Sequence, residues 1–540
     1  MLENKPQEDL EKKKKKYRKR DKLWKLLFPK NKTPEPISNL DNDQNNRINA
    51  LEKYAVNNFS FCLDRDAFKS VLEKNDWDFK KSTLDLRDYE EAVHGILISP
   101  PVIPTTHLLG SENDNGTSCY IDALLFAMYI SNTAFDPLLT YDISASDETK
   151  IQLQTLFRLF VNKLRKGHLI PAEHIHWLRK VMEAANWKGR DEHGNWSQED
   201  ASELFLFITE FFDLPYLPFQ IRLFHGANRD TDDDRVMTDR MVALSIPENT
   251  KDIIPLETIL VDYFYNNIIT GVKRQVERDI FASPSASSFL SDKKMDISEQ
   301  EDQEVAVTAW QVLELLPFYS ASNEQGDSIQ TQVDSSFPDT HMILPIVLKR
   351  YCYRNGVSTK IATKVDIPPN IDFNRFVNRS VDDPTCSVCG HLINWTLHFK
   401  SAVCHKGSSP YSGHYIGYSR VLCGDDEVYW LKLDDLDKEH RVTMIKEKDA
   451  SSIFNDLAKN AYIIFYELDK TCHHDNTSFS STSEPAEWMD DLKQVDSNST
   501  FKTGIPHNEF LTGMANAKAT IFIPPQCGYT SAPRGPTQQA

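Results

Sequence analysis

The sequence predicts an α+β protein whose largest domain, residues 105–467, mixes helices and strands. Two stretches carry this prediction. After Cys119, apolar residues recur with the spacing of a helix that has one buried face, namely Ile121, Leu124, Leu125 and Met128. Far along the chain, residues 415–418 have the pattern of a strand, and a turn at 423–425 leads to a second strand, "EVYWLKLDD". Helices and strands in separate stretches are typical of α+β domains.

Length and composition set the class of protein. The 540 residues allow roughly two to four domains, and 40% hydrophobic with 26% charged residues is typical of a globular protein. No apolar run reaches the 18 residues of a membrane span, and the N-terminus lacks a signal-peptide core. Nine scattered cysteines favour a reducing compartment, so we expect the cytoplasm, the nucleus or both. The net charge of −18 argues against nucleic acid and favours a partner with a basic face.

Two tails flank the ordered regions. Residues 1–45 form a basic tail and linker, and the first 30 residues carry twelve Lys or Arg against five acids. Three interpretations stay open for this tail: a solvated disordered segment, an address read by an import receptor, or an amphipathic segment that touches anionic membrane through Trp24, Leu26, Leu27 and Phe28. Residues 468–540 are rich in Ser, Thr, Pro, Asn and Gly, and we expect them to be largely disordered.

Residues 46–97 predict a small unit of three helices. Leu51 and Tyr54 indicate the first helix, Phe68 and Val71 the second, and a third follows a turn at residues 75–76. The string "VLEKNDWDFKKSTLDL" resembles the ubiquitin-associated (UBA/CUE-like) module. The alternative is a helical appendage that packs on the next domain. The proline-rich segment "ISPPVIP" ends the unit.

Cys119 is either a buried structural thiol or a nucleophile. Free cysteines are usually buried. However, Gly116, Thr117 and Ser118 bring the chain into a helix that begins near Cys119. A helix N-terminus favours a thiolate and is expected to lower the pKa of the thiol from its usual ~8.5. A catalytic thiol also needs a base and a group that orients the base.

One histidine has a setting that suits such a base. Gly413 leaves space for a substrate backbone before His414, and the predicted hairpin can bring His414 beside Asp434 on the neighbouring strand. The carboxylate would then fix the imidazole tautomer and stabilise imidazolium.

At this point five motifs resemble one family. "NGTSCYIDALLF" is similar to the cysteine box of the ubiquitin-specific proteases, which are papain-like deubiquitinases. "HKGSSPYSGHYIGYSR…VYWLKLDD", with the closing "AYIIFYE", resembles their histidine box. "SQEDASELFLFI", "LPIVLKRY" and "VDIPPNIDF" resemble motifs that lie between the two boxes. The resemblance covers residues 105–467 and implies a papain-like fold with a helical thumb, a β-rich palm and reduced fingers. Within this domain, the acidic and serine-rich composition of about 281–338 indicates an insertion loop.

The resemblance also implies roles for individual residues. Cys119 becomes the nucleophile, His414 the general base and acid, Asp434 the orienting carboxylate and Asp435 a supporting one. The residues expected to contact the C-terminal tail of ubiquitin are Gln198, Asp200, Glu203, Gly413 and Tyr415. Carboxylates suit the arginines of that tail, although a solvent-facing helix start would also explain Gln198, Asp200 and Glu203.

One departure concerns the oxyanion hole. The family usually carries an asparagine five residues before the cysteine, where this chain has Asp114 between Asn113 and Asn115. Either a neighbouring asparagine acts instead, or the backbone N–H of Cys119 suffices, or activity is reduced, because one lost donor costs about 10²–10³ in rate.

A second departure concerns zinc. Residues 225–351 contain no cysteine, so the zinc site of the fingers is absent. "CSVCGH" supplies Cys386, Cys389 and His391, with His398 and Cys404 as additional candidates, and its position resembles the cylindromatosis-type branch of the family. Because structural zinc needs four ligands, a metal-free turn is the expectation and zinc the alternative.

The sequence thus predicts a deubiquitinase that needs no cofactor and acts on ubiquitin and ubiquitinated proteins. Two alternatives remain, a ubiquitin-binding scaffold without activity and a protease for another ubiquitin-like modifier.

Overall fold

The structure is a computed structural model of the 540-residue chain. It describes residues 41–59, 65–214, 217–224, 234–248, 251–265, 267–274, 303–313, 342–354, 357–376, 390–391, 394–424 and 427–471. The basic tail up to residue 40, the C-terminal tail from residue 472 and most of the acidic insertion therefore lie outside the described residues. Within the described part, no helix combines the length and the apolar character needed to cross a membrane.

Three helices form the N-terminal unit: α2 (Asn42–Asn58), α3 (Arg65–Lys74) and α4 (Phe79–Val93). Asp41 begins α2 with a capping box, and Asp78 caps α4 by accepting a hydrogen bond from the backbone of Lys81. The helices bury Leu51, Phe68 and Leu86 between them. Their relation to ubiquitin-associated modules stays a prediction.

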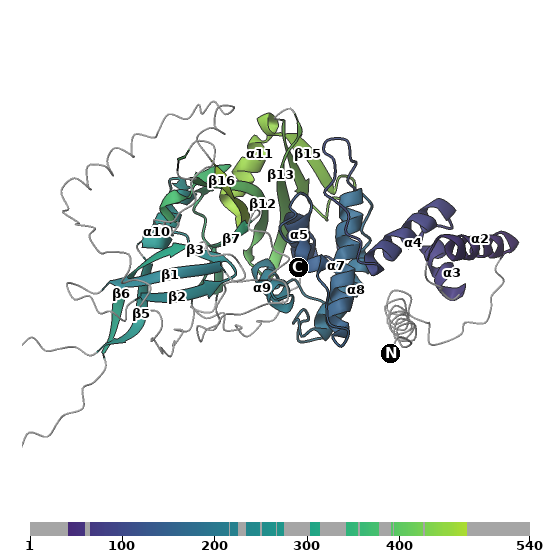
Figure 1. Ribbon diagram of the computed structural model, residues 1–540, viewed down its shortest axis with the longest axis horizontal. Helices are drawn as coiled ribbons and strands as arrows, with labels where there is room; N and C mark the ends of the chain where they lie inside the picture. The colour runs from purple at the N-terminus through teal and green to yellow at the C-terminus, as the bar shows by residue number, and fades with distance from the viewer. Residues whose placement is uncertain are drawn as a thin grey trace, which may run out of the picture.

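Five helices follow, and with the N-terminal unit they make up one side of the molecule: α5 (Cys119–Tyr129), α6 (Asp136–Thr140), α7 (Glu148–Lys166), α8 (Ala172–Ala184) and α9 (Ala201–Phe211). In Figure 1, α7 and α8 lie side by side between the N-terminal unit and α5. All eleven residues of α5 are buried, so this short helix runs through the interior.

The centre of the molecule is an eight-stranded sheet with the order β15-β14-β13-β12-β16-β7-β3, and β11 pairs with β12. All neighbours are antiparallel except β3 and β7. The strands are β3 (Val242–Ser245), β7 (Met342–Lys349), β11 (Asn370–Asp372), β12 (Asn394–Ser409), β13 (Ser412–Leu422), β14 (Val428–Leu433), β15 (Val442–Lys446) and β16 (Ala461–Thr471).

Both faces of this sheet are buried. Side chains alternate between faces along a strand, so Val403 and Tyr415 pack with the helices α5 to α9, while Ala402 and Ile416 join the other core. The second core is covered by α10 (Leu256–Tyr265) and α11 (Ser451–Asn460). The predicted α+β fold is confirmed.

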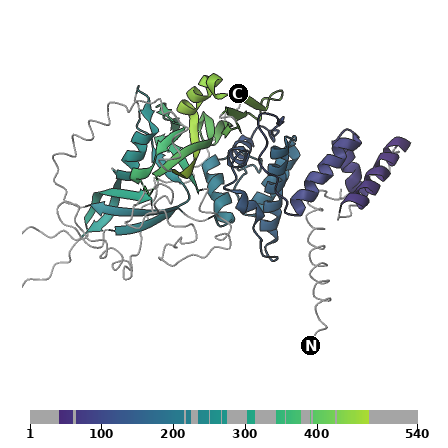
Figure 2. The same cartoon turned by 45° about the horizontal axis from the view of Figure 1, so that its top comes forward.

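The remaining strands form smaller sheets. β1 (Leu217–Phe224), β2 (Asp234–Asp239), β5 (Asn267–Arg274) and β6 (Gln303–Leu313) make a four-stranded sheet of order β2-β1-β6-β5, seen beside the central sheet in Figures 1 and 2. β6 falls inside the predicted insertion. Within the described residues, two further pairs of strands are β4 (Ile254–Pro255) with β10 (Val365–Asp366) and β8 (Tyr351–Arg354) with β9 (Val357–Lys360). The described residues also include the 3-10 helices η4 (Asn374–Phe376) and η6 (Glu447–Asp449).

The N-terminal unit packs directly on α7 and α8. Lys163 of α7 is buried between Asp85 and Asp88 of α4, at 2.7 and 2.9 Å. Arg158 of α7 donates to the carbonyl of Ala92 at 2.6 Å. The hydrophobic core runs without a break from α2–α4 into the helices α5–α9, and both views show α4 against α7. The unit is therefore joined to its neighbour by buried contacts.

Candidate active site

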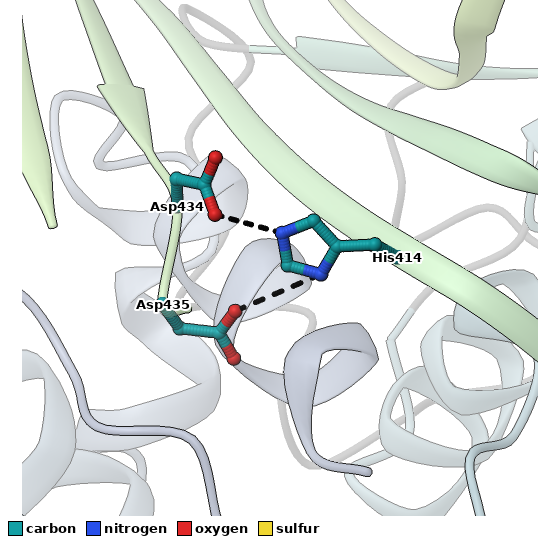
Figure 3. A group of neighbouring side chains, drawn as sticks. All are labelled: His414, Asp434 and Asp435. Atoms are coloured by element: carbon teal, nitrogen blue, oxygen red, sulfur yellow. Dashed lines mark hydrogen bonds and ion pairs between the residues drawn. The ribbon is translucent and has the colours of Figure 1, made fainter. Parts of the chain in front are cut away.

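His414 and Asp434 form the hydrogen bond at the centre of the site. His414 lies near the start of β13, and Asp434 directly follows β14, its neighbour in the sheet. The Nε2–H of His414 donates to Asp434 Oδ1 at 2.8 Å (Figure 3). The hydrogen bond from His414 lowers the pKa of Asp434 well below its usual value. Asp434 therefore remains ionised at neutral pH and can orient the ring.

Cys119 is the first residue of α5, and α5 packs against β13. Gly417 makes this close packing possible, because a Cβ at that position would lie 2.8 Å from Phe126 Cδ1 and 3.1 Å from the carbonyl oxygen of Ala123. The sulfur is close enough to the backbone N–H of Tyr415, the residue after His414, to accept a hydrogen bond from it. A helix start and a strand start thus bring the thiol and the imidazole into one site.

The thiol itself is bonded elsewhere. Cys119 is 2% exposed, and its S–H donates to Gln198 Oε1 with a sulfur–oxygen distance of 3.7 Å. No hydrogen bond joins the Cys119 thiol to the ring of His414, although both side chains are described. The Nδ1 atom of His414 has no hydrogen-bond partner among the described residues. For His414 to act as a base, the Cys119 thiol must first turn away from Gln198 and donate its proton to Nδ1 of His414.

The protonation of Cys119 differs from the sequence-based expectation. Burial raises the pKa of the thiol to about 12, and Asp435 would add to the rise in its ionised form. Backbone N–H groups of Tyr415 and Tyr120 act in the opposite direction but do not outweigh burial. The lower pKa expected at a helix N-terminus was therefore wrong for this state, because the helix start lies inside the protein and away from water.

Asp114 is buried and paired rather than open to the site. Its Oδ2 lies 3.2 Å from Nη1 of Arg179, a fully buried residue of α8, and 3.6 Å from Nδ1 of His176. Asn115 donates its Nδ2–H to Asp114 Oδ1 at 2.7 Å. The cation beside Asp114 offsets the charge that would repel an oxyanion. Among the flanking amides, Asn113 is likewise engaged, by donating to Asp435 Oδ2 at 2.7 Å.

The two carboxylates expected to contact the ubiquitin tail, Asp200 and Glu203, differ in their exposure to solvent. Asp200 is fully buried and caps α9, accepting from Ser202 N at 2.7 Å and from Tyr462 Oη at 2.6 Å. Glu203, one turn into α9, is half-buried and accepts from Tyr411 Oη at 3.1 Å. Burial raises the pKa of Glu203 to about 7, and the nearby Asp200 adds to the rise. Of these two carboxylates, only Glu203 reaches solvent.

Gly413 and Tyr415 shape the hairpin between β12 and β13. Gly413 is exposed with φ +124°, and a Cβ there would lie 2.3 Å from the carbonyl oxygen of Lys406 on the paired strand. The ring of Tyr415 is buried, and its hydroxyl donates to the carbonyl of Pro410 at 3.0 Å. The backbone N–H of Tyr415 is thus the group of this residue that bonds to the Cys119 sulfur.

His405 is a site residue that the sequence analysis missed. It lies on β12 opposite Tyr415, and its ring centroid is 4.1 Å from that of Tyr415. Its Nδ1 bonds to the hydroxyl of Tyr351, and its Nε2 lies 3.5 Å from Nε2 of Gln198. Burial lowers the pKa of His405 to about 3, so the ring is neutral and can accept from the Gln198 amide. The sequence "VCHKG" could have indicated this residue, because pairing of its strand with the strand of Tyr415 places His405 opposite Tyr415.

Most of the zinc prediction cannot be compared with the structure, because Cys386 and Cys389 lie outside the described residues. His391 is exposed. His398 bonds to Asn370 through Nδ1 at 2.8 Å, and Cys404 is fully buried in the second core. Within the described ranges no group of cysteines and histidines has the arrangement of a structural zinc site.

Comparison with known families gives one match over most of the folded region. The family model described as ubiquitin carboxyl-terminal hydrolase matches residues 110–466, which is more than half of the chain. Among curated proteins, the human ubiquitin carboxyl-terminal hydrolase 17-like proteins 11 and 6 are each 28% identical over 143 residues. These alignments cover 26% of this chain and 22% and 29% of the two relatives, so the chain spans about a quarter of their length.

Two solved structures are among the matches. A chain of the yeast SAGA DUB module with an Sgf73 mutant has a TM-score of 0.40 at 14% identity, and a chain of the Ubp8–Sgf11–Sgf73–Sus1 SAGA DUB module has a TM-score of 0.38 at 14% identity. Both alignments cover 73% of this chain and 75% of the other. On the extent of the family match, this chain belongs to the ubiquitin carboxyl-terminal hydrolase family.

Proposed function

We propose that the protein is a cysteine-dependent deubiquitinase, in which Cys119 is the nucleophile, His414 the general base and acid, and Asp434 the group that orients His414. The observation that supports this most is the 2.8 Å hydrogen bond between His414 and Asp434, because His414 lies in β13 one residue before the backbone N–H that faces the Cys119 sulfur. Family membership supplies the substrate class, the carboxyl terminus of ubiquitin.

The proposed reaction has two stages. His414 Nδ1 takes the proton of Cys119, and the thiolate attacks the carbonyl carbon of the C-terminal glycine of ubiquitin. His414 then gives this proton to the departing lysine amine, the C–N bond breaks and a thioester forms. Water, deprotonated by His414, attacks the thioester, which releases the ubiquitin carboxylate and returns the thiol. All steps use side chains of this chain, so we propose that no cofactor takes part.

Glu203 is the group that we propose to meet a basic residue of the ubiquitin tail. It is the half-exposed carboxylate of α9, and Tyr411 from the β12–β13 turn bonds to it. Leu206, one turn further along α9, is 38% exposed and offers an apolar contact beside it. We propose a cytoplasmic or nuclear location on the basis of the cysteine content.

The test is reaction of the purified protein with ubiquitin that carries an electrophile at its C-terminus. We expect one adduct on Cys119 in the unchanged protein and none in Cys119→Ala. His414→Gln should lower the rate of labelling by about 10³ or more, because the thiol then has no base. A chain that binds ubiquitin without forming an adduct would instead be a ubiquitin-binding scaffold, and our proposal would be wrong. Labelling by another ubiquitin-like modifier at a higher rate would reassign the substrate.

A further inference from the structure

Asp122 and Asp435 form a buried pair of carboxyl groups beside His414. Asp122 lies one turn after Cys119 in α5, Asp435 follows Asp434 after β14, and the two side chains are 0% and 4% exposed. Their carboxyl groups hydrogen-bond to each other. Ser111 also hydrogen-bonds to Asp122, whereas Oδ1 of Asp435 receives no hydrogen bond from a nitrogen or hydroxyl of the described residues. Because an ionised carboxylate has no hydrogen to donate, the contact between the two carboxyl groups requires one proton on the pair.

The surroundings show which carboxyl holds that proton. Ser118 Oγ donates to Asp122 Oδ2 at 2.8 Å, and the charge of Arg179 also favours an ionised Asp122. Asp435 instead has the ionised Asp434 as its neighbour, and its one hydrogen bond from an amide comes from Asn113. The negative charge therefore belongs on Asp122 and the proton on Asp435.

Asp435 also faces the nitrogen that the proposed reaction needs. Its Oδ1 lies 3.9 Å from Nδ1 of His414 (Figure 3). The other ring nitrogen is bonded to Asp434, so Nδ1 is the atom left to take the proton of Cys119. If Asp435 were ionised, it would stabilise a proton on Nδ1 and would oppose a negative charge on the sulfur. Asp435 would then replace the thiolate as the partner of imidazolium.

We infer that Asp122 is a positioning residue, which holds Asp435 in its neutral form through their shared hydrogen and thereby leaves Nδ1 of His414 to the Cys119 thiol. The inference rests on the roles proposed above for Cys119 and His414. The charged groups that face the pair are Arg179, Asp434 and His414.

The expected titration agrees with this arrangement. Burial raises the pKa of Asp435 to about 9, and the charge of Asp122 adds to the rise. Burial also raises the pKa of Asp122, but less, because hydrogen bonds from Ser111 and Ser118 and the charge of Arg179 favour its charged form. At neutral pH the two carboxyl groups thus hold one proton between them.

The test measures the thiol without ubiquitin. Alkylation of Cys119 by iodoacetamide, followed by mass spectrometry from about pH 6 to about pH 9, reports the thiolate. In Asp122→Asn the new amide can donate to Asp435, which then ionises at a lower pH. We expect alkylation of Cys119 to be roughly tenfold slower than in the unchanged protein just below pH 9, one pKa unit being a factor of ten. The deficit should close toward pH 6, where Asp435 is protonated in both proteins.

The rescue separates this role from a merely structural one. Asp122→Asn/Asp435→Asn removes the competing anion and should recover most of the lost rate across the whole pH range. Asp142→Asn, which removes an exposed carboxylate, is the matched control. An unchanged rate in Asp122→Asn, or a double variant as slow as the single one, would overturn the inference. If the alkylation pattern holds but the ubiquitin probe forms no adduct, the proposed function fails and the inference about the thiol stands.

Discussion

At the residue scale, Gln198 orients the Cys119 thiol by accepting its hydrogen bond. Its amide N–H donates to the carbonyl of Pro410 at 3.3 Å, which leaves Oε1 to accept from the sulfur. The neutral ring of His405 accepts from the same amide side. Three contacts therefore fix the orientation of the Gln198 amide, and the thiol is held as a donor, away from His414.

Gln198→Glu tests this contact. A carboxylate in place of the amide would put a negative charge close to the sulfur and would lose the donor to Pro410, so the pKa of the thiol rises further. We expect the rate of labelling by a ubiquitin electrophile to fall by about tenfold or more at neutral pH, because one pKa unit changes the thiolate fraction tenfold. Gln44→Glu at the capping box of α2 is the matched control, since glutamate also fits that position. An unchanged labelling rate would show that the Gln198 amide does not govern the thiol.

If Glu203 meets a basic tail as proposed, its titration should make binding depend on pH. Its pKa is raised to about 7, so the side chain loses its charge as the pH falls through 7, and attraction to a cation weakens in that direction. In the Cys119→Ala protein, affinity for ubiquitin should be lower at pH 6 than at pH 8. Glu203→Gln should weaken binding by up to about fivefold at pH 8, which is the range expected for a half-exposed ion pair. The same change should remove most of the difference in affinity between pH 6 and pH 8.

Titration of binding by calorimetry checks this expectation. Glu210→Gln changes an exposed carboxylate further along α9 and serves as the control. If the two variants behave alike, Glu203 is not the group that meets the tail.

The residues of the site differed in how far the sequence could predict them. His414 and Asp434 are 20 residues apart on two strands of one hairpin, so a local pattern indicates their proximity. Arg179 reaches Asp114 from a helix 65 residues away, and His405 reaches Gln198 across 207 residues. Such contacts depend on how α8 and β12 pack in three dimensions, and no local spacing carries that information.

At the element scale, the contact between α5 and β13 places the Cys119 thiol relative to His414. The sequence predicted a helix after Cys119 with one buried face, whereas the structure buries the whole helix, because α7 and α9 cover the sides that β12 and β13 leave free. Periodicity indicates a helix but not how many neighbours surround it. The contact itself depends on Gly417, which lets the helix approach the strand.

Gly417→Ala should separate the two elements. The added methyl would meet Phe126 and the backbone of Ala123 at less than ordinary contact distance, so α5 must shift. A displacement of about 1 Å between reacting groups can cost roughly a hundredfold in rate, and we expect a loss of about ten- to a hundredfold in kcat with a folded protein. Gly424→Ala is the control, because a Cβ there meets nothing within 4 Å. Steady-state cleavage of a ubiquitin reporter, with circular dichroism to check folding, gives the answer; equal kcat values for the two variants would contradict it.

At the scale of the whole molecule, the N-terminal unit and the helices α7 and α8 share one core and a set of buried charges. The sequence predicted three helices at these positions but left open whether they stand apart or pack on the next domain. Acidic residues of α4 and basic residues of α7 are about 75 residues apart, and their pairing becomes visible only when the helices meet.

Asp88 tests the importance of that interface. Asp88 contacts Lys163 at 2.9 Å, Lys166 at 3.0 Å and His168 at 2.9 Å, and its side chain is 1% exposed. Asp88→Asn leaves buried cations with less compensation, so we expect the free energy of unfolding to fall by about 3–5 kcal/mol. Asp43→Asn removes an exposed i,i+4 partner of Arg47 and should cost about 0.5 kcal/mol or less. Urea unfolding followed by fluorescence compares them, and similar losses in the two variants would contradict the prediction.

The same interface makes the free energy of unfolding depend on pH on the acid side. Burial raises the pKa of Asp88, but the hydrogen bond from His168 and the charges of Lys163 and Lys166 outweigh it, and the pKa lies well below its usual value. A lowered folded-state pKa means that the stabilisation is present above the ordinary value near 4 and is lost as the pH falls through the folded value. Asp88→Asn should therefore flatten the fall in stability on the acid side.

A thiol that stays protonated is a poor target for oxidants, since peroxide attacks the thiolate. Because burial and the bond to Gln198 keep Cys119 in its protonated form, the resting protein should survive hydrogen peroxide that would inactivate a free thiolate. Sensitivity should appear only when a substrate draws the sulfur toward His414. Oxidative stress would then inactivate the molecules engaged in turnover and spare the idle ones.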